Sequence, residues 1–318
     1  MRQTRRSIAA RALAIVAVIA TLAGCAPSPV PDRFAIAGGG VTGVYYSFGA
    51  ELAEEYSARF GAAVTVDETN GSVDNLQRVG DGRALLGFAQ SDAAADAVAG
   101  AGAFPEPLPV AAIARLYDEY VHVVVRSDSD VARLADLEGR AVSLGAPGSG
   151  VNLVARRVLD AAGVSPANVT DEELGLAESI AALRAGDIEA FFWVGGLPTP
   201  GLTELFADTP SRLLSIESAT VERVNAEHGG VYRLAEFPIG AYGRAEATAT
   251  MTVPNYLMVA DSTSDDEVVA LLTSLFDSRS RIAADVPAAA LLDRRQAIFT
   301  DPVSLHPGAV AYYRDARD

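Results

Sequence analysis

Residues 33–43 have the sequence RFAIAGGGVTG, and residues 63–72 have the sequence AVTVDETNGS. Each stretch begins with a short apolar run typical of a buried strand and ends in glycine and small polar residues, where a helical pattern starts. Helices are expected at 43–60 and 72–79, with a third strand at 85–89 and another helix after it. This β-α-β-α-β order predicts a parallel sheet with right-handed crossovers, and hence an α/β fold.

The rest of the chain predicts a second α/β unit. Two strands are expected at 110–114 and 121–125. The pattern beyond them predicts a strand at 141–144, helices at 150–162 and 176–185, a strand at 188–194, a helix at 199–206 and a strand at 212–216. A return strand is expected at 250–259, followed by a mostly helical tail from Asp265.

Two α/β lobes with two chain crossings account for this order of elements. One lobe is expected to comprise residues 33–125 and 248–318, and the other residues 126–247. Residues 1–24 are expected to form a signal peptide, and residues 25–32 a Pro-rich tether. The part from residue 33 onward is long enough to bury a core in each lobe.

The N-terminal segment has the composition of a secretory signal. Four arginines and no acidic residue accompany an apolar run at 12–23, which is shorter than the roughly 20 residues of a spanning helix. The motif Leu22-Ala-Gly-Cys25 resembles a lipobox and contains the only cysteine, and a Pro-rich spacer follows it. The sequence therefore predicts an exported protein, lipid-anchored through Cys25 to the outer face of the cytoplasmic membrane, or periplasmic. An uncleaved anchor helix is the alternative.

Charge and composition exclude several classes of function. The chain has 25 basic residues against 41 acidic ones, for a net charge of −16, and its sequence contains no lysine. Binding to nucleic acid depends on clustered basic groups and is not expected here. Without lysine, the chain has neither a Walker A phosphate loop nor a Schiff-base lysine.

Four strand-to-helix junctions are the candidate binding elements: Gly38–Gly43, Thr69–Ser72, Gln90–Asp92 and Gly145–Gly150. In a parallel sheet such junctions lie at the carboxyl ends of the strands, where ligands bind. Each helix start offers unpaired N–H groups and the positive end of the helix dipole, which suits an anion. Each junction alone also fits an ordinary turn or cap, with Ser72 and either Ser91 or Asp92 as expected caps. Gly-rich helix starts in both lobes favour a site between the lobes.

An enzyme is one alternative class. Residues 38–43 match G-x-G-x-x-G after a strand and before a helix, as in dinucleotide-binding Rossmann enzymes. The export signal argues against this, because nicotinamide cofactors are cytoplasmic. His122, His228 and His306 lack metal-ligand spacing, and Gly148-Ser-Gly150 lacks the first glycine of a nucleophile elbow. Neither catalytic residues, a metal nor a cofactor is expected.

Seven motifs follow one another in an order that resembles a known family: GVTGVYY at 40–46, NGSVDN at 70–75, LGFAQSD at 86–92, GAPGSG at 145–150, EAFF at 189–192 with GGLP at 195–198, VPN at 253–255, and HPGA at 306–309 with YYR at 312–314. Together they are similar to the TAXI class of solute receptors of TRAP transporters. The resemblance implies a periplasmic-binding-protein fold of type II, whose two lobes close on a small carboxylate such as glutamate or a dicarboxylate. It also implies a TRAP-type permease as partner, and we expect a monomer.

The matched motifs imply a set of ligand-binding residues: Thr42, Gly43, Tyr45, Asn70, Ser72, Asn75, Gln90, Ser91, Asp92, Tyr117, Ser149, Gly150 and Val151. Backbone N–H groups and hydroxyls are expected to hold the carboxylate, and Asp92 an ammonium group if the solute has one. Tyr117 is expected on the hinge side, and Tyr45 fits a core role equally well. Val151 stands where family members often have threonine, which puts one hydroxyl contact in doubt.

A sensory or scaffold lipoprotein is a second alternative. Such a protein would share the anchor and the fold but would lack a transporter. A fused TRAP permease gene beside this one would favour transport.

We predict that the mature chain begins at Cys25 and partitions with membranes. The lipobox and the spacer motivate this expectation, and stable anchoring needs two or more acyl chains, because one chain holds only marginally. Mass spectrometry of the mature N-terminus checks the prediction, with Cys25→Ser as the soluble control. A different N-terminus, or a wild type that is as soluble as the control, would contradict it.

Overall fold

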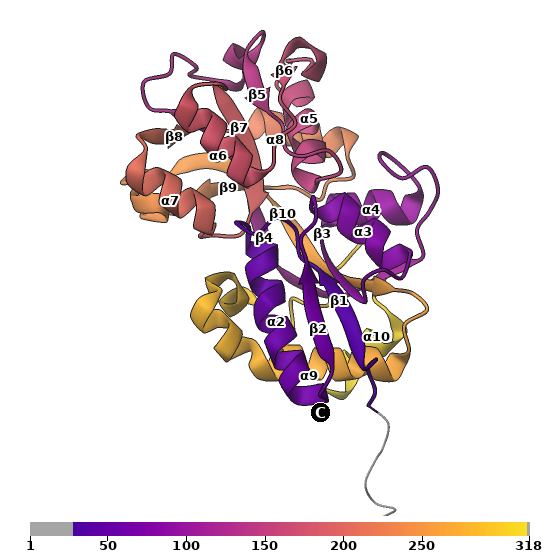
Figure 1. Cartoon of the computed structure of the whole chain (residues 1–318). Helices are drawn as coiled ribbons and strands as arrows, with labels where there is room; N and C mark the ends of the chain where they lie inside the picture. Colours follow the sequence, from indigo (N-terminus) through magenta and orange to yellow (C-terminus); the bar gives the residue numbers. More distant parts are fainter. Residues whose placement is uncertain (1–27, 317–318) are drawn as a thin grey trace, which may run out of the picture.

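The computed structural model describes residues 28–316, so the predicted signal peptide and Cys25 lie outside the described residues. Figure 1 shows two α/β lobes, one above the other, with strands β4 and β10 passing between them. Among the helices of residues 28–316, none combines the length and the apolar composition needed to cross a membrane.

The lower lobe in Figure 1, lobe I, contains both ends of the described chain. Its elements are β1 (Arg33–Ala37), α2 (Val44–Phe60), β2 (Ala63–Asp67), α3 (Ser72–Gly80), β3 (Leu86–Gln90), α4 (Ser91–Ala99), the first part of β4 (Val110–Arg126), the last part of β10 (Thr248–Ala260), α9 (Asp265–Asp285), the 3-10 helix η4 (Pro287–Leu291) and α10 (Pro307–Asp315).

The upper lobe, lobe II, is formed by the middle of the chain. Besides the remaining parts of β4 and β10, its elements are η1 (Leu134–Leu137), β5 (Ala141–Ser143), α5 (Gly150–Ala161), η2 (Pro166–Asn168), β6 (Thr170–Asp171), α6 (Leu176–Ala185), β7 (Ala190–Gly195), α7 (Pro200–Asp208), β8 (Ser211–Leu213), α8 (Ser218–Glu227), β9 (Arg233–Phe237) and η3 (Ala241–Gly243).

One hydrogen-bonded sheet runs through both lobes, in the order β2-β1-β3-β10-β4-β7-β5-β6, with β8 on β4 and β9 on β10. Strand β1 is parallel to β2 and β3, and β5 is parallel to β6 and β7. Strand β10 is antiparallel to both β3 and β4, and β4 is antiparallel to β7. The parallel strands of each lobe therefore present their carboxyl ends, and the loops that follow them, at the junction of the lobes.

The two lobes have separate hydrophobic cores. On β4, Tyr117 packs in a core of lobe I, whereas Val121 packs in a core of lobe II. On β10, Val253 belongs to the lobe II core and Tyr256 to a lobe I core. This packing favours crossing points inside β4 and β10, and the exact domain boundaries stay a proposal.

Apolar periodicity explains the main helices. On α2, Phe48, Leu52 and Tyr56 are spaced by four residues, so they share one face, and all three are fully buried. Helix α9 starts with a capping box in which Ser264 and Glu267 satisfy each other's backbone N–H groups. Most of the predicted elements of both lobes are found within a few residues of their expected positions.

Three local predictions were wrong. The two strands expected at 110–114 and 121–125 are a single strand, β4, because it pairs first with β10 and then with β7 without a break. Ser72 does not cap α3: the cap position is Gly71, and the Ser72 hydroxyl instead accepts the backbone N–H of Gln90. Helix α4 likewise begins at Ser91 itself, without a side-chain cap. Helix α8 and strand β9 were not predicted.

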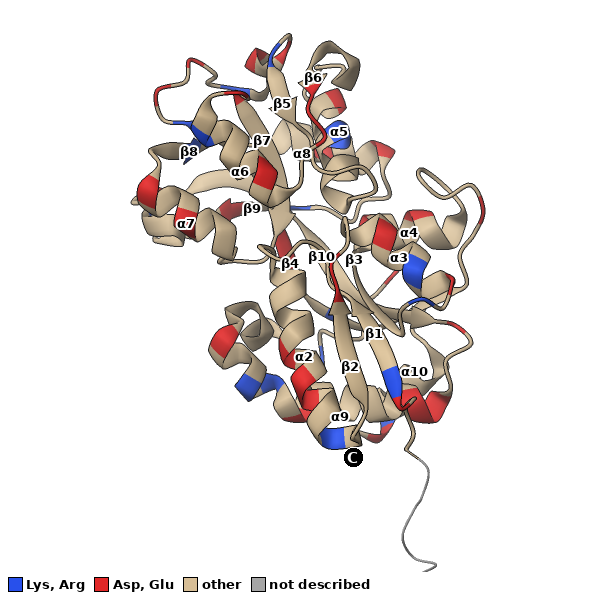
Figure 2. Ribbon diagram, in the orientation of Figure 1, with Lys and Arg blue, Asp and Glu red and all other residues tan. Residues whose placement is uncertain are grey.

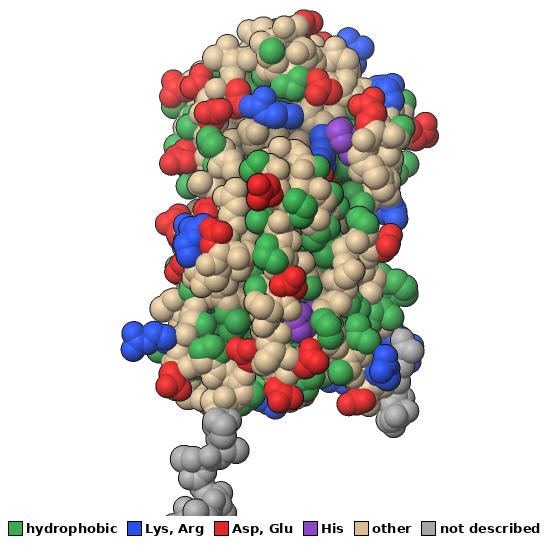
Figure 3. Space-filling model, turned by 90° about the vertical axis from the view of Figure 1, so that its right-hand side faces the viewer, with side chains coloured by type: hydrophobic (Ala, Val, Ile, Leu, Met, Phe, Trp, Pro, Cys, Tyr) green, Lys and Arg blue, Asp and Glu red, His purple; other side chains and the backbone are tan. Residues whose placement is uncertain are grey.

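Charged side chains are spread over the molecule. Figure 2 shows acidic residues on helices and loops of both lobes, and Figure 3 shows acidic, basic and hydrophobic side chains interspersed on one face.

Candidate ligand-binding site

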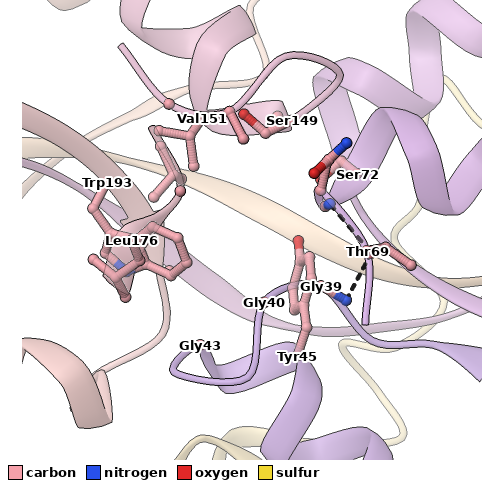
Figure 4. Close-up of a pocket in the computed structure, with 18 of the residues that line it drawn as sticks. Gly39, Gly40, Gly43, Tyr45, Thr69, Ser72, Ser149, Val151, Leu176 and Trp193 are labelled. Carbon is pink, nitrogen blue, oxygen red and sulfur yellow. Dashed lines mark hydrogen bonds between the residues drawn. The ribbon is translucent and has the colours of Figure 1, made fainter. Parts of the chain in front are cut away.

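A cavity of about 390 Å³ lies between the lobes, at the carboxyl ends of the parallel strands. The loops after β1, β2, β5 and β6 line it, together with the end of β7 and the middle of β4. Figure 4 shows Tyr45, Thr69 and Ser72 of lobe I facing Val151, Leu176 and Trp193 of lobe II. The site is therefore built from both halves of the fold.

Four helices begin at this cavity, and each leaves backbone N–H groups without an intrahelical acceptor. Their first residues are Val44 of α2, Ser72 of α3, Gly150 of α5 and Leu176 of α6, and all four line the cavity. Helices α3 and α6 have an acidic residue in the first turn, whereas α2 and α5 have none. The positive ends of α2 and α5 are thus the less compensated ones, which favours an anion near them.

Hydroxyl and amide groups form the wall contributed by lobe I. The Thr69 hydroxyl accepts the N–H groups of Gly39 (2.9 Å) and Gly71 (3.2 Å), which ties the first two junctions together. Gly39 has a φ of 71°, a left-handed conformation that suits glycine. The Ser72 hydroxyl holds the N–H of Gln90 at 3.1 Å. The loops that face the cavity are therefore fixed by their own polar groups.

Glu119 lies at the floor of the cavity, on the part of β4 between the two cores. It is 1% exposed, and the Tyr45 hydroxyl donates a hydrogen bond to its Oε2 at 3.0 Å. Burial raises the pKa of Glu119 to about 8, an effect that hydrogen bonds from Tyr45 and Gln90 only partly offset. Gln90 is also buried, and its Oε1 has no hydrogen-bond partner among residues 28–316. A pKa of about 8 favours the protonated form of Glu119 at neutral pH.

Apolar side chains form the opposite wall. Val151 and Leu176 are at the starts of α5 and α6, and Trp193 is on β7. The Trp193 indole donates a hydrogen bond to the Thr199 hydroxyl at 3.0 Å, which fixes the ring. A side chain on Gly43 would meet this indole at 3.2 Å, so the ring packs closely on the start of α2.

The lobes touch each other beside the cavity. The backbone N–H of Asp74 in lobe I donates to the Gly148 carbonyl of lobe II at 3.1 Å. Gly150 at the start of α5 lies directly against Gln90 and Ser72 of lobe I, so that a Cβ there would be 2.7 Å from the Ser72 hydroxyl. The structure therefore has its lobes closed over the cavity.

Of the predicted site residues, the structure brings together those at the cavity wall: Thr42, Gly43, Tyr45, Asn70, Ser72, Gln90, Ser149, Gly150 and Val151. Four others lie behind the wall. Asn75 holds the Phe88 carbonyl at 2.8 Å, Ser91 is buried, and Tyr117 stacks on Phe48 in the core.

Asp92 is the fourth of these residues, and its carboxylate is bound by other side chains of the protein. Its carboxylate pairs with Arg157 at 3.1 Å and accepts the Tyr232 hydroxyl at 2.6 Å, and Asp96 pairs with the same arginine at 2.7 Å. Arg157 and Tyr232 are on lobe II, so this buried cluster links the lobes. The expectation that Asp92 takes an ammonium group does not fit this geometry.

Sequence reasoning missed several residues of the cavity. Glu119 was overlooked, although it is an acidic residue between apolar stretches that were expected to be strands. Trp193 carried a signal as the only tryptophan of the chain, two residues before Gly195. Thr69, at the start of an expected junction, and Leu176, the first residue of an expected helix, were not named as site residues.

Solved structures with the same architecture are binding proteins. One is the periplasmic binding protein BugD, with a TM-score of 0.57 at 13% identity over 90% of this chain and 94% of that one. Another is the alkanesulfonate-binding protein SsuA from Xanthomonas axonopodis pv. citri bound to MOPS. Its TM-score is 0.51 at 17% identity, over 89% of this chain and 84% of that one. PhnD1 from Prochlorococcus marinus (MIT 9301), in complex with methylphosphonate, has a TM-score of 0.52 at 12% identity, over 82% of this chain and 90% of that one. The fold is that of type II periplasmic binding proteins, as the motif resemblance implied.

The chain belongs to the NMT1-like family, whose model matches residues 36–316. The match spans both lobes and every loop that lines the cavity.

The raised pKa of Glu119 predicts a pH-dependent stability. The ordinary pKa is 4.5 and the folded value is about 8, so the folded state binds an extra proton between these values. The free energy of unfolding should therefore fall as the pH rises from about 5 to about 8, by at most about 1.4 kcal/mol per pH unit, and level off above that. Urea denaturation at several pH values measures this slope.

Glu119→Gln is the matched variant, because it keeps the shape and cannot ionise. The slope of its unfolding free energy over this pH range should be smaller than that of the wild type. Equal slopes for the wild type and Glu119→Gln would show that Glu119 titrates normally.

Proposed function

We propose that this protein is an extracytoplasmic solute-binding protein that captures a small anionic solute between its lobes and delivers it to a membrane transporter. The single observation that supports this most strongly is the cavity at the lobe junction, to which both lobes contribute helix starts. Ligands of open α/β sheets bind at this place. The family and the fold agree with a binding function.

An anion is the preferred solute because of the groups that face the cavity. The first residues of α3 and α5 line the cavity together with the Ser72 and Ser149 hydroxyls. Charge-assisted hydrogen bonds contribute roughly 1.5–3 kcal/mol each, so a few of them are sufficient for micromolar binding near −8 kcal/mol after association costs. A carboxylate is the anion we propose. Arg78 also lines the cavity, but it is paired with Asp74 and Asp67.

The Rossmann-enzyme alternative has little structural support. The dinucleotide-binding fold has the strand order 3-2-1-4-5-6 in a mostly parallel sheet. Here β1 lies between β2 and β3, and the next strand, β10, is antiparallel and comes from the end of the chain. A sensory binding lipoprotein remains compatible with the same site, and only the partner distinguishes it from a transport protein.

The class of transporter is open to test. The motif resemblance implies a TRAP-type permease of the TAXI class, whereas the similarity of the fold to a putative L-cystine ABC transporter favours an ABC-type partner. Reconstituted uptake with the neighbouring permease separates them. Uptake that needs ATP supports an ABC-type partner, and uptake driven by an ion gradient alone supports a TRAP-type one. A protein that binds the solute but supports no uptake would be a sensor.

We predict that Gly150→Ala holds the lobes apart. The new Cβ would collide with the Gln90 amide and lie 2.7 Å from the Ser72 hydroxyl, both on lobe I. Alanine is a better helix former than glycine, so α5 itself should not suffer. The variant should have a larger radius of gyration by X-ray scattering, altered Trp193 fluorescence, and at least tenfold weaker solute binding, since about 1.4 kcal/mol of lost closure energy suffices.

Gly40→Ala is the control for this variant. Gly40 also lines the cavity, but a Cβ there meets nothing within 4 Å, so its scattering should match the wild type. If Gly150→Ala is as compact as Gly40→Ala and binds equally well, the lobes do not need this contact to close.

A further inference from the structure

The cavity has two chemically different walls. Its lobe I side presents the Thr69 and Ser72 hydroxyls and the Gln90 amide, whereas its lobe II side presents Val151, Leu176 and Trp193. In Figure 4 the three apolar side chains lie together on one side, across the cavity from Tyr45 and Ser72. A solute that fills this cavity must place an apolar part against the lobe II wall, because polar groups there would lose their hydrogen bonds to water.

The anion-binding groups gather at one end of the cavity. The starts of α3 and α5 meet there. A Cβ added to Gly71 would lie 3.7 Å from the Ser149 Cβ, and Gly150 lies against Ser72 and Gln90. The start of α2, at the other end, is covered by the Trp193 ring. The starts of α3 and α5 and the Ser72 and Ser149 hydroxyls are therefore found together at one end of the cavity.

A second negative charge would find poor partners. The ionisable side chains at the cavity wall are four carboxylic acids and one base: Glu68, Asp74, Glu119, Glu178 and Arg78. Of the acids, the buried Glu119 favours its protonated form. The Arg78 guanidinium is bound to Asp74 at 2.9 Å and to Asp67 at 3.3 Å. Glu178 already accepts the N–H of Gly175 at the start of α6 (2.8 Å), which offsets that helix dipole. Within residues 28–316, the wall therefore has no uncommitted cationic side chain for a second carboxylate.

We propose that the solute is a monoanion with an apolar body, such as a small aliphatic or aromatic monocarboxylate, rather than a dicarboxylate. Its anionic group binds at the starts of α3 and α5, and its body packs against Val151, Leu176 and Trp193. This assignment rests on the proposed solute-binding function and narrows its substrate class. Val151 fits this assignment, because a valine side chain enlarges the apolar wall next to the anion.

Hexanoate and adipate test the proposal as a matched pair of probes, since adipate differs only by a second terminal carboxylate. Binding is followed by Trp193 fluorescence and by calorimetry on the full mature protein. Hexanoate should bind at least tenfold more tightly than adipate, and phenylacetate should behave like hexanoate. Adipate binding as tightly as hexanoate, or more tightly, would overturn the assignment and leave the solute-binding function in place. If a broad panel of organic anions leaves both signals unchanged, the proposed function fails as well.

The variant Val151→Thr tests whether the apolar body of the solute contacts Val151. It replaces one methyl group by a hydroxyl of similar size, and we expect the preference for hexanoate over adipate to shrink by about tenfold. Val158→Thr is the control on the same helix, because Val158 is fully buried away from the cavity. It should lower the melting temperature without changing the ratio of the two affinities. Equal effects of both variants on this ratio would remove Val151 from the binding site and overturn the placement of the apolar body.

Discussion

The antiparallel pair of β4 and β10 is the constraint on which the rest of the molecule depends. These strands span 17 and 13 residues. They join the three paired strands of lobe I to the three of lobe II, so the two lobes share one sheet only through them. Their pairing is irregular between Pro254 and Tyr256, opposite the stretch of β4 that leads to Glu119. Proline lacks a backbone N–H, and such irregularities bend a strand. The bend thus falls where the chain passes between the cores, and it places Glu119 at the floor of the cavity.

The first lobe was predictable because its signals are local. The strand at 33–37, the helix that begins next to Gly43 and the order of β1, α2, β2, α3 and β3 follow from short apolar runs and glycine junctions, and these are properties of neighbouring residues. The same reasoning placed most of the cavity wall, since parallel strands bring their carboxyl ends to one edge. It missed the continuity of β4, because that depends on β7 and β10, which are far away in the sequence.

The misplaced site residues have the same origin. Asp92 follows a strand and begins a helix, as Ser72 does, so the local pattern treats the two positions alike. Only the folded structure shows that Arg157, 65 residues away on α5, pairs with this carboxylate. Burial raises the pKa of Asp92, and the arginine opposes this effect. Breaking such a buried pair leaves an uncompensated charge, so the cluster constrains how the lobes meet rather than what they bind.

The proposed binding of an anion would be coupled to closure through the helix starts. In the closed arrangement α3 and α5 approach each other with their N-terminal ends, and both ends carry partial positive charge. Part of this charge is offset by Asp74 in the first turn of α3 and by the Gly148 carbonyl that accepts its N–H. The start of α5 has no acid of its own, so an anion between the two helices offsets what remains. A bound anion therefore interacts more favourably with the closed lobes than with separated ones, and this difference in affinity is what allows a solute to shift the equilibrium toward closure.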